Sequence, residues 1–464
     1  MTLTIMWLGA FFLLVLCALV EPESPDGAAA QVATVFKPST AVPLELSKTL
    51  RERLLLKTYD LQLGALMSQY HLYTPPALLL EHPPKRRFKK EVLGYVTPWN
   101  RRGYETSLQM QRMGKLDFAV PVWFRVVKRP RQAEPERGGG GGKGKGKGKD
   151  AGKQANEEGN EVHIEGVEDI DLEWLQEMRR PLSNPNSAHL TRILPRVKVE
   201  TSLAGDDIAT TVKLLSYLQE KHGFEGFTLE GDLNNLEAVL QLLVVMREYS
   251  MFVVLVVPPV IVPAGSEGDG MRRALLLLST NADRLSVMTY DQRQGTGEPN
   301  APTPWVRQIV QSLSFDKDLR RKILIGVPYY GWNSLGEDVT AEKLVAWMTS
   351  VYGPGGPGTA GAGAGSSATG AQGGNAGAGV RRDVALVWNK EAEEHVFVER
   401  AQALVGAAVD VLGAAAPVFT EAVRCYYPTH AMLYKRLRLV EKEQVAGVAI
   451  WELGQGFPSF MDLY

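Results

Sequence analysis

Residues 206–250 read DDIATTVKLLSYLQEKHGFEGFTLEGDLNNLEAVLQLLVVMREYS, a helix pattern, a strand pattern and a second helix pattern in succession. Asp206–His222 has apolar residues at helical spacing, and Gly223 is the residue type that commonly follows a helix end. Phe224–Leu229 is a short apolar run typical of a buried strand. Asn234–Ser250 then begins with a capping residue. This order predicts an α/β fold with a parallel sheet.

The same alternation continues on both sides of this stretch, from Glu91 to the end of the chain. The other apolar runs are Val92–Val96, Phe118–Phe124, Leu190–Val197, Phe252–Val257, Leu285–Tyr290, Ile323–Val327 and Val448–Trp451. Near-continuous apolar strands separated by helices indicate a parallel sheet that is covered on both faces. Eight such units predict a (β/α)8 TIM barrel over residues 91–464 rather than an open doubly wound sheet. Too few residues follow Trp451 for a long closing helix.

Two segments of low complexity interrupt this pattern. The first, at about residues 135–160, contains the run GGGGGKGKGKGK, and the second, at about residues 353–380, is mostly Gly and Ala. Neither can bury enough apolar area to offset the entropy cost of ordering, so we expect disordered loop insertions. The region from 334 to about 428 has room for a small α+β insertion between strands seven and eight. Its candidate strands are Ala385–Trp388, His395–Val398 and Arg424–Tyr427.

The N-terminal region has a different character. Leu3–Val20 is an almost uninterrupted apolar run, which predicts a signal peptide over residues 1–20 and a secreted or lysosomal protein. The run is also nearly long enough to span a bilayer, so a retained membrane anchor is the alternative. Residues 21–90 are expected to form a stem with one amphipathic helix at Ser47–Met67.

Composition excludes several classes of function. Lys+Arg total 51 against 52 for Asp+Glu, so the chain has no overall basic field for nucleic acid. Two cysteines exclude a disulfide scaffold and a four-cysteine zinc site. The seven histidines show no metal-binding spacing, and the glycine runs lack the context of a phosphate loop. We therefore expect no metal, no cofactor and no nucleic-acid partner.

Function in a barrel of this kind is located at the C-terminal ends of the strands. In this sequence those ends carry aromatic residues and acids. The candidate ligand-binding residues are Tyr95, Trp99, Trp123, Glu230, Asp232, Met288, Tyr290, Asp291, Trp332 and Trp451. Flat rings cover the apolar faces of sugars, and carboxylates accept hydrogen bonds from sugar hydroxyls. The set predicts a carbohydrate ligand.

The fourth strand has the most specific pattern. Because residues two apart on a strand share a face, Thr228, Glu230 and Asp232 are expected to point together into the barrel mouth. Two carboxylates this close favour sharing a proton, which is the arrangement that an acid catalyst needs. The alternative is an acidic pair bonded to neighbouring Tyr or Arg side chains, and the sequence leaves both open.

Four motifs carry a resemblance to a known family. GYVTPW at 94–99, GFEGFTLEGD at 223–232, MTYD at 288–291 and GVAIWELGQG at 447–456 together resemble glycoside hydrolase family 18, the chitinases, and in particular its chitinase-like branch. The resemblance covers residues 91–464 apart from the two insertions. It implies a barrel that takes chitooligosaccharides, and hydrolysis assisted by the N-acetyl group of the substrate. For the branch it also implies saccharide binding and a sorting or scavenger receptor as a further partner.

The chain departs from the family at its catalytic motif, D-G-x-D-x-D-x-E. Laid on this sequence, the motif falls on Glu225 and Gly226, then Thr228, Glu230 and Asp232. Asp232 is one methylene shorter than the family's catalytic Glu, and a misplacement of roughly 1 Å can cost about 100-fold in rate. Every acidic position is thus changed or lost, which argues against ordinary chitinase turnover.

Other family positions are kept. The resemblance places Tyr290, Asp291 and Trp451 where the family grips the −1 sugar. The first hypothesis is therefore a carbohydrate-binding protein for chitooligosaccharides or related glycans. The second is a weak or altered glycosidase with Asp232 or Glu230 as the general acid. The third is a structural or partner-binding barrel whose mouth is a relic.

Overall fold

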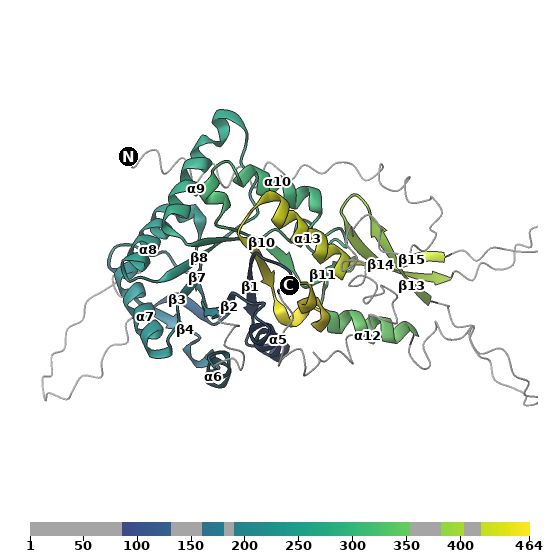
Figure 1. Cartoon of the computed structure of the whole chain (residues 1–464), viewed down its shortest axis with the longest axis horizontal. Coiled ribbons are helices and arrows are strands. Elements are labelled where there is room, and N and C mark those ends of the chain that lie inside the picture. Colours follow the sequence, from purple (N-terminus) through teal and green to yellow (C-terminus); the bar gives the residue numbers. More distant parts are fainter. Residues whose placement is uncertain (1–85, 131–159, 181–189, 353–381, 403–418) are drawn as a thin grey trace, which may run out of the picture.

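The computed structural model describes residues 86–130, 160–180, 190–352, 382–402 and 419–464 (Figure 1). The N-terminal signal or anchor, the helix expected at Ser47–Met67 and most of both low-complexity insertions lie outside the described residues, so these stay predictions. Within the described ranges, no helix is long and apolar enough to cross a membrane.

The strands of the barrel are parallel neighbours around a ring (Figure 1). They are β1 (Glu91–Val96), β2 (Phe118–Pro121), β3 (Phe124–Pro130), β5 (Arg192–Ile193), β6 (Arg196–Val199), β7 (Gly226–Glu230), β8 (Phe252–Val257), β9 (Arg284–Val287), β10 (Ile323–Pro328) and β16 (Gly447–Trp451). Short breaks divide β2 from β3 and β5 from β6, so each pair is one barrel strand. β1 pairs with β16 on one side and with β2 on the other, while β2 pairs with β5 and β6 pairs with β7. The ring therefore closes with eight strands, which confirms the predicted (β/α)8 barrel.

Both faces of β1, β7, β8, β10 and β16 are buried, which explains why the sequences of these strands are almost continuously apolar. Leu93 and Tyr95 belong to a cluster inside the barrel, together with residues such as Val254. Val92 and Val96, on the alternate positions of β1, belong to the larger cluster that packs under the helices. Strands in parallel sheets that are covered on both faces are expected to show this pattern.

The helices cover the outside of the ring. They are α5 (Arg101–Arg112), α6 (Leu172–Met178), α7 (Asp206–His222), α8 (Leu236–Glu248), α9 (Asp269–Asn281), α10 (Thr303–Leu313), α11 (Lys317–Arg320) and α13 (His430–Glu443). A further helix, α12 (Ala341–Tyr352), packs instead against the strands that are inserted between β10 and α13. Helix α7 has the predicted bounds, and Gly223 ends it in the left-handed conformation with φ 66°.

Helix α8 begins later than its sequence pattern suggested. A 3-10 turn, η4 (Leu233–Asn235), comes first, and the N-cap is Asn235 rather than Asn234. The side-chain oxygen of Asn235, Oδ1, accepts a hydrogen bond from the Ala238 amide. The remaining 3-10 turns are η3 (Val167–Asp169), η5 (Gly265–Gly268), η6 (Leu453–Gln455) and η7 (Pro458–Leu463).

A second sheet is inserted between β10 and α13 and lies beside the barrel (Figure 1). Its order is β12 (Asp338–Val339), β11 (Gly331–Asn333), β15 (Phe419–Tyr426), β14 (Glu394–Gln402) and β13 (Arg382–Asn389), all antiparallel. This sheet confirms the small insertion that the sequence predicted. One further strand, β4 (Asn160–Glu165), pairs antiparallel with β3 and was not predicted.

The chain after β16 packs against α5 and α13 instead of forming a long helix. Turns η6 and η7 lead to Tyr464, whose side chain is buried. The Tyr329 hydroxyl, just after β10, donates to the Tyr464 hydroxyl at 2.9 Å.

Candidate functional site

Trp451 and Tyr95 lie side by side at the C-terminal end of the barrel. Trp451 ends β16, and Tyr95 is the second-last residue of the neighbouring strand β1. Their ring centroids are 5.1 Å apart. The Trp451 ring is partly exposed, whereas Tyr95 is buried and its hydroxyl lies 3.1 Å from Ser286 Oγ. Burial raises the pKa of Tyr95 well above its usual value, so the phenol stays neutral at physiological pH. The pair presents an aromatic surface backed by a fixed polar contact.

A second cluster forms around Asp291, four residues after the end of β9. Asp291 Oδ1 accepts hydrogen bonds from the Tyr330 hydroxyl at 2.5 Å and from the Trp332 indole Nε1 at 2.8 Å. Asp291 has φ 61°, a left-handed conformation that aspartate and asparagine tolerate better than most residues. Burial, together with the Asp291 charge, raises the pKa of Tyr330 well above its usual value, so its hydroxyl remains a donor.

Tyr290 connects the two clusters. Its side chain is buried, and its ring lies edge-on to Tyr330 with centroids 6.2 Å apart. Burial raises the pKa of Tyr290 well above its usual value, with further contributions from Tyr95, Asp291 and the charge of Glu230.

Glu230 is the last residue of β7, and its carboxylate is paired with Arg196. Arg196 begins the neighbouring strand β6, and its Nη1 lies 2.9 Å from Glu230 Oε2. The Arg196 side chain is largely buried, whereas that of Glu230 is 31% exposed. The arrangement matches the alternative in which the acid is bonded to a neighbouring arginine.

Asp232 does not share the site with Glu230, which corrects the expectation of a carboxylate pair. Strand β7 ends at Glu230, and the period of two holds only within a strand. Asp232 is exposed and caps η4, where its Oδ1 accepts bonds from the backbone and side-chain nitrogens of Asn234, both at 2.9 Å. Thr228 is buried in the barrel wall, where its hydroxyl donates to the Leu194 carbonyl.

Asp232 lies instead in a separate hollow of about 320 Å³. This hollow is formed by the chain after β6 and by the start of α8, and its polar lining includes Thr201, Ser202 and Asn235.

Three other candidate residues have different placements. Trp123 is 3% exposed, and its indole Nε1 donates to the Tyr104 hydroxyl at 2.8 Å while its ring packs edge-on against Trp174. We therefore assign Trp123 to the core under α5 and α6, which corrects its place in the ligand-binding set. Trp99 is 72% exposed in the loop after β1, on the same rim as Trp451. Met288 is partly buried against the core.

Sequence reasoning missed four residues that the structure brings into or next to the site. They are Arg196, Asn300, Tyr330 and Glu452. Tyr330 and Glu452 were visible as strand-end residues, but neither was selected. No spacing rule connects Arg196 to Glu230 or Asn300 to Asp291, because the contacts depend on strand register and on a loop conformation.

Glu452 follows Trp451, but its side chain points to the outside of the barrel. It is 1% exposed, and its Oε1 accepts a hydrogen bond from Asn100 Nδ2 at 2.7 Å. A Cβ added to Gly103 of α5 would lie 3.1 Å from Glu452 Oε2, so the carboxyl group faces the start of that helix. Burial raises the pKa of Glu452 to about 7, against hydrogen bonds from Asn100 and Thr97 that lower it.

Glu452 should make the stability of the protein depend on pH. Below the unfolded-state pKa of 4.5 the group is protonated in both states, and as the pH rises toward about 7 only the unfolded state ionises. Stability should therefore fall over this window, by about 3 kcal/mol for this group. In Glu452→Gln this contribution should be absent. Denaturant unfolding of both proteins at pH 4 to 8 measures it, and parallel curves for the two proteins would contradict it.

Comparison with known proteins supports the fold. No family model matches the chain. A class V chitinase from Pseudomonas fluorescens Pf-5 superposes with a TM-score of 0.52 at 14% identity, covering 81% of this chain and 98% of that one. A chitinase from Chromobacterium violaceum ATCC 12472 gives 0.49 at 12% identity, with 81% and 97% covered. A family 18 chitinase from Cycas revoluta, solved in complex with (GlcNAc)3, gives 0.46 at 11% identity, with 80% and 97% covered. The likeness to the Pseudomonas fluorescens protein shows that the chain has a chitinase-like barrel fold, at low sequence identity.

Proposed function

We propose that this protein binds chitooligosaccharides or related glycans at the mouth of its barrel without hydrolysing them. The observation that carries the proposal is the cluster around Asp291, in which one carboxylate oxygen accepts bonds from both Tyr330 and Trp332. The barrel fold shared with the Pseudomonas fluorescens chitinase supports a carbohydrate-related function.

The chemistry of the mouth suits a sugar. The partly exposed ring of Trp451 offers an apolar face for sugar C–H groups, and its contact with Tyr95 holds it in place. Neither described bond to Asp291 uses Oδ2, so this atom can accept a hydrogen bond from a sugar hydroxyl or amide. Fixed aromatic faces with a few polar groups are typical of small-molecule sites.

The acids at the fourth strand do not favour hydrolysis. A general acid must lie within hydrogen-bonding reach of the oxygen that it protonates. Glu230 is paired with Arg196, and Asp232 bonds to Asn234 in a different hollow. Glu452, although its pKa is about 7, faces α5. Weak glycosidase activity through Glu230 or Asp232 is therefore the second outcome to test.

Isothermal titration with N-acetylglucosamine oligomers of two to six units, followed by product analysis of the same samples, tests the proposal. We expect affinity that grows with oligomer length and ligand that is recovered intact after days. Recovered shorter oligomers that disappear in Glu230→Gln or Asp232→Asn would support the glycosidase. Neither heat nor products would favour a structural or partner-binding barrel.

We also propose that the chain enters the secretory pathway and acts outside the cell or in lysosomes. The apolar run Leu3–Val20 at the N-terminus supports this location. Expression with and without residues 1–20 tests it, since only the longer chain should reach the medium or the lysosomal fraction. The glycan is the proposed partner, and a receptor stays a prediction from the family resemblance.

A further inference from the structure

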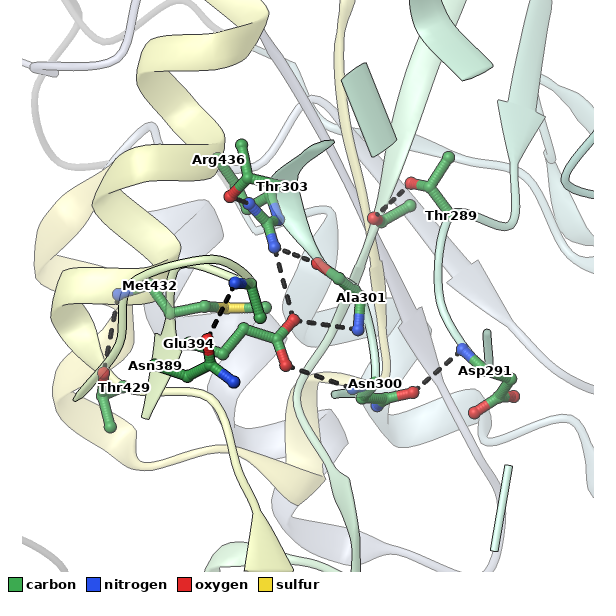
Figure 2. Close-up of polar contacts among 12 residues, drawn as sticks. Thr289, Asp291, Asn300, Ala301, Thr303, Asn389, Glu394, Thr429, Met432 and Arg436 are labelled. Atoms are coloured by element: carbon green, nitrogen blue, oxygen red, sulfur yellow. Dashed lines mark hydrogen bonds and ion pairs between the residues drawn. The ribbon is translucent and has the colours of Figure 1, made fainter. Parts of the chain in front are cut away.

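Asn300 connects the Asp291 cluster to the rest of the molecule (Figure 2). Its side-chain oxygen accepts a hydrogen bond from the Asp291 amide at 2.9 Å, and its side-chain nitrogen donates to the Tyr330 carbonyl at 3.1 Å. The buried side chain of Asn300 thus bonds to the backbone of both Asp291 and Tyr330, whose side chains bond to each other. The Asp291 backbone has a positive φ, so its conformation depends on such contacts.

Asn300 is in turn held by Glu394, the first residue of β14 in the inserted sheet. Glu394 Oε2 accepts from the Asn300 amide at 3.1 Å, and Oε1 accepts from the Ala301 amide at 2.9 Å (Figure 2). The Glu394 side chain is buried, and its charge is balanced by Arg436 of α13 at 3.4 Å. Arg436 also donates to the Ala301 carbonyl and to Thr303 Oγ1.

This buried group is costly to remove from water, because a charged pair in the interior loses its hydration. A second charged pair, Glu393 with Lys435 at 2.5 Å, joins the same two parts of the chain one residue away and is partly exposed. The inserted sheet would therefore still be joined to α13 by an ion pair without Glu394 and Arg436. What distinguishes Glu394 is its pair of bonds to the amides of Asn300 and Ala301.

We propose that Glu394 and Asn300 are positioning residues through which the inserted sheet holds Asp291, Tyr330 and Trp332 in the geometry that receives a glycan. The effect on affinity rests on the proposed function. The effect on the Asp291 geometry does not, because it can be measured without a ligand.

The test is Asn300→Ala, with Glu394→Gln as a second variant that keeps the side-chain shape. The first readout is the Trp332 indole N–H signal in ¹H–¹⁵N spectra, assigned with Trp332→Phe, because a bond to a carboxylate shifts that signal. The second is titration with N-acetylglucosamine oligomers. Lys435→Gln is the matched control, since it removes the neighbouring charged pair without touching Asn300.

We expect both variants to move the Trp332 indole signal and to weaken glycan binding about tenfold, the size of one lost hydrogen bond. Lys435→Gln should change neither, and thermal melts should show that all variants are folded. An unmoved indole signal in a folded Asn300→Ala or Glu394→Gln protein would overturn the inference. If the wild-type protein binds no glycan, the proposed function fails, and a moved indole signal still supports the positioning role.

Discussion

Replacing Trp451 with alanine is expected to weaken chitooligosaccharide binding by at least about 30-fold, the effect typical of losing a central aromatic anchor. The indole provides the partly exposed face at the barrel mouth, and its contact with Tyr95 keeps that face fixed. Alanine removes the whole surface against which a sugar ring would pack. Isothermal titration of both proteins with the same oligomer measures the difference.

Two further variants separate loss of the aromatic face from loss of folding. Trp451→Phe keeps a flat ring and should retain part of the affinity. Tyr217→Ala removes an exposed aromatic side chain from α7, on the outside of the barrel, and should leave affinity unchanged. Unchanged affinity in a folded Trp451→Ala protein would contradict the assignment of Trp451 to the site.

The second large effect is expected at Asp291. Asp291→Ala removes the acceptor for Tyr330 and Trp332, and leaving such donors without a partner costs about 1–3 kcal/mol each. Both aromatic side chains should then move, and we expect glycan affinity to fall by about 30-fold or more. Titration with the longest soluble oligomer, for which we expect the highest affinity, allows the largest loss of affinity to be measured.

Asparagine is the matched control at this position. Asp291→Asn keeps an oxygen that can accept both bonds, and asparagine tolerates the left-handed backbone. Its affinity should stay within about fivefold of the wild type, since the geometry is kept and only the charge is lost. Equal losses in the alanine and asparagine variants would show that the charge of Asp291, rather than its hydrogen bonds, decides binding.

The barrel could be predicted from the sequence because its signals are local. Most of the barrel strands are buried on both faces, so runs such as Phe252–Val257 are continuous in the sequence and in the structure. The bounds of the helix Asp206–His222 follow from the spacing of its apolar residues and from the glycine that comes directly after it. Two strands of the insertion were also visible, because Ala385–Trp388 and His395–Val398 are short runs with mostly apolar residues within β13 and β14.

The site was harder to predict, since it depends on where a strand ends and on contacts across strands. The spacing of Thr228, Glu230 and Asp232 suggested one face, but β7 stops at Glu230 and the chain turns into η4. No pattern in the sequence marks that turn strongly enough to separate the two carboxylates. Trp123 was placed wrongly for a related reason. It lies at a strand break, and the sequence does not show whether such a tryptophan faces the barrel mouth or the core.

The sequence predicted Tyr290, Asp291, Trp332 and Trp451 as site residues, and the structure shows the contacts of their side chains. Asp291 bonds to Trp332 directly, and its backbone is fixed by Asn300, nine residues further along the chain. Asn300 is in turn fixed by Glu394 in the inserted sheet. These hydrogen bonds join separate segments of the chain, so the periodicity of apolar residues within one segment cannot predict them.

A crystal structure of the protein with a bound N-acetylglucosamine oligomer tests the central claim most directly. We expect a sugar ring packed on Trp451, with a hydroxyl or amide group bonded to Asp291 Oδ2 and the oligomer intact. An empty mouth, with the sugar bound instead in the hollow beside Asp232 or elsewhere on the surface, would contradict it.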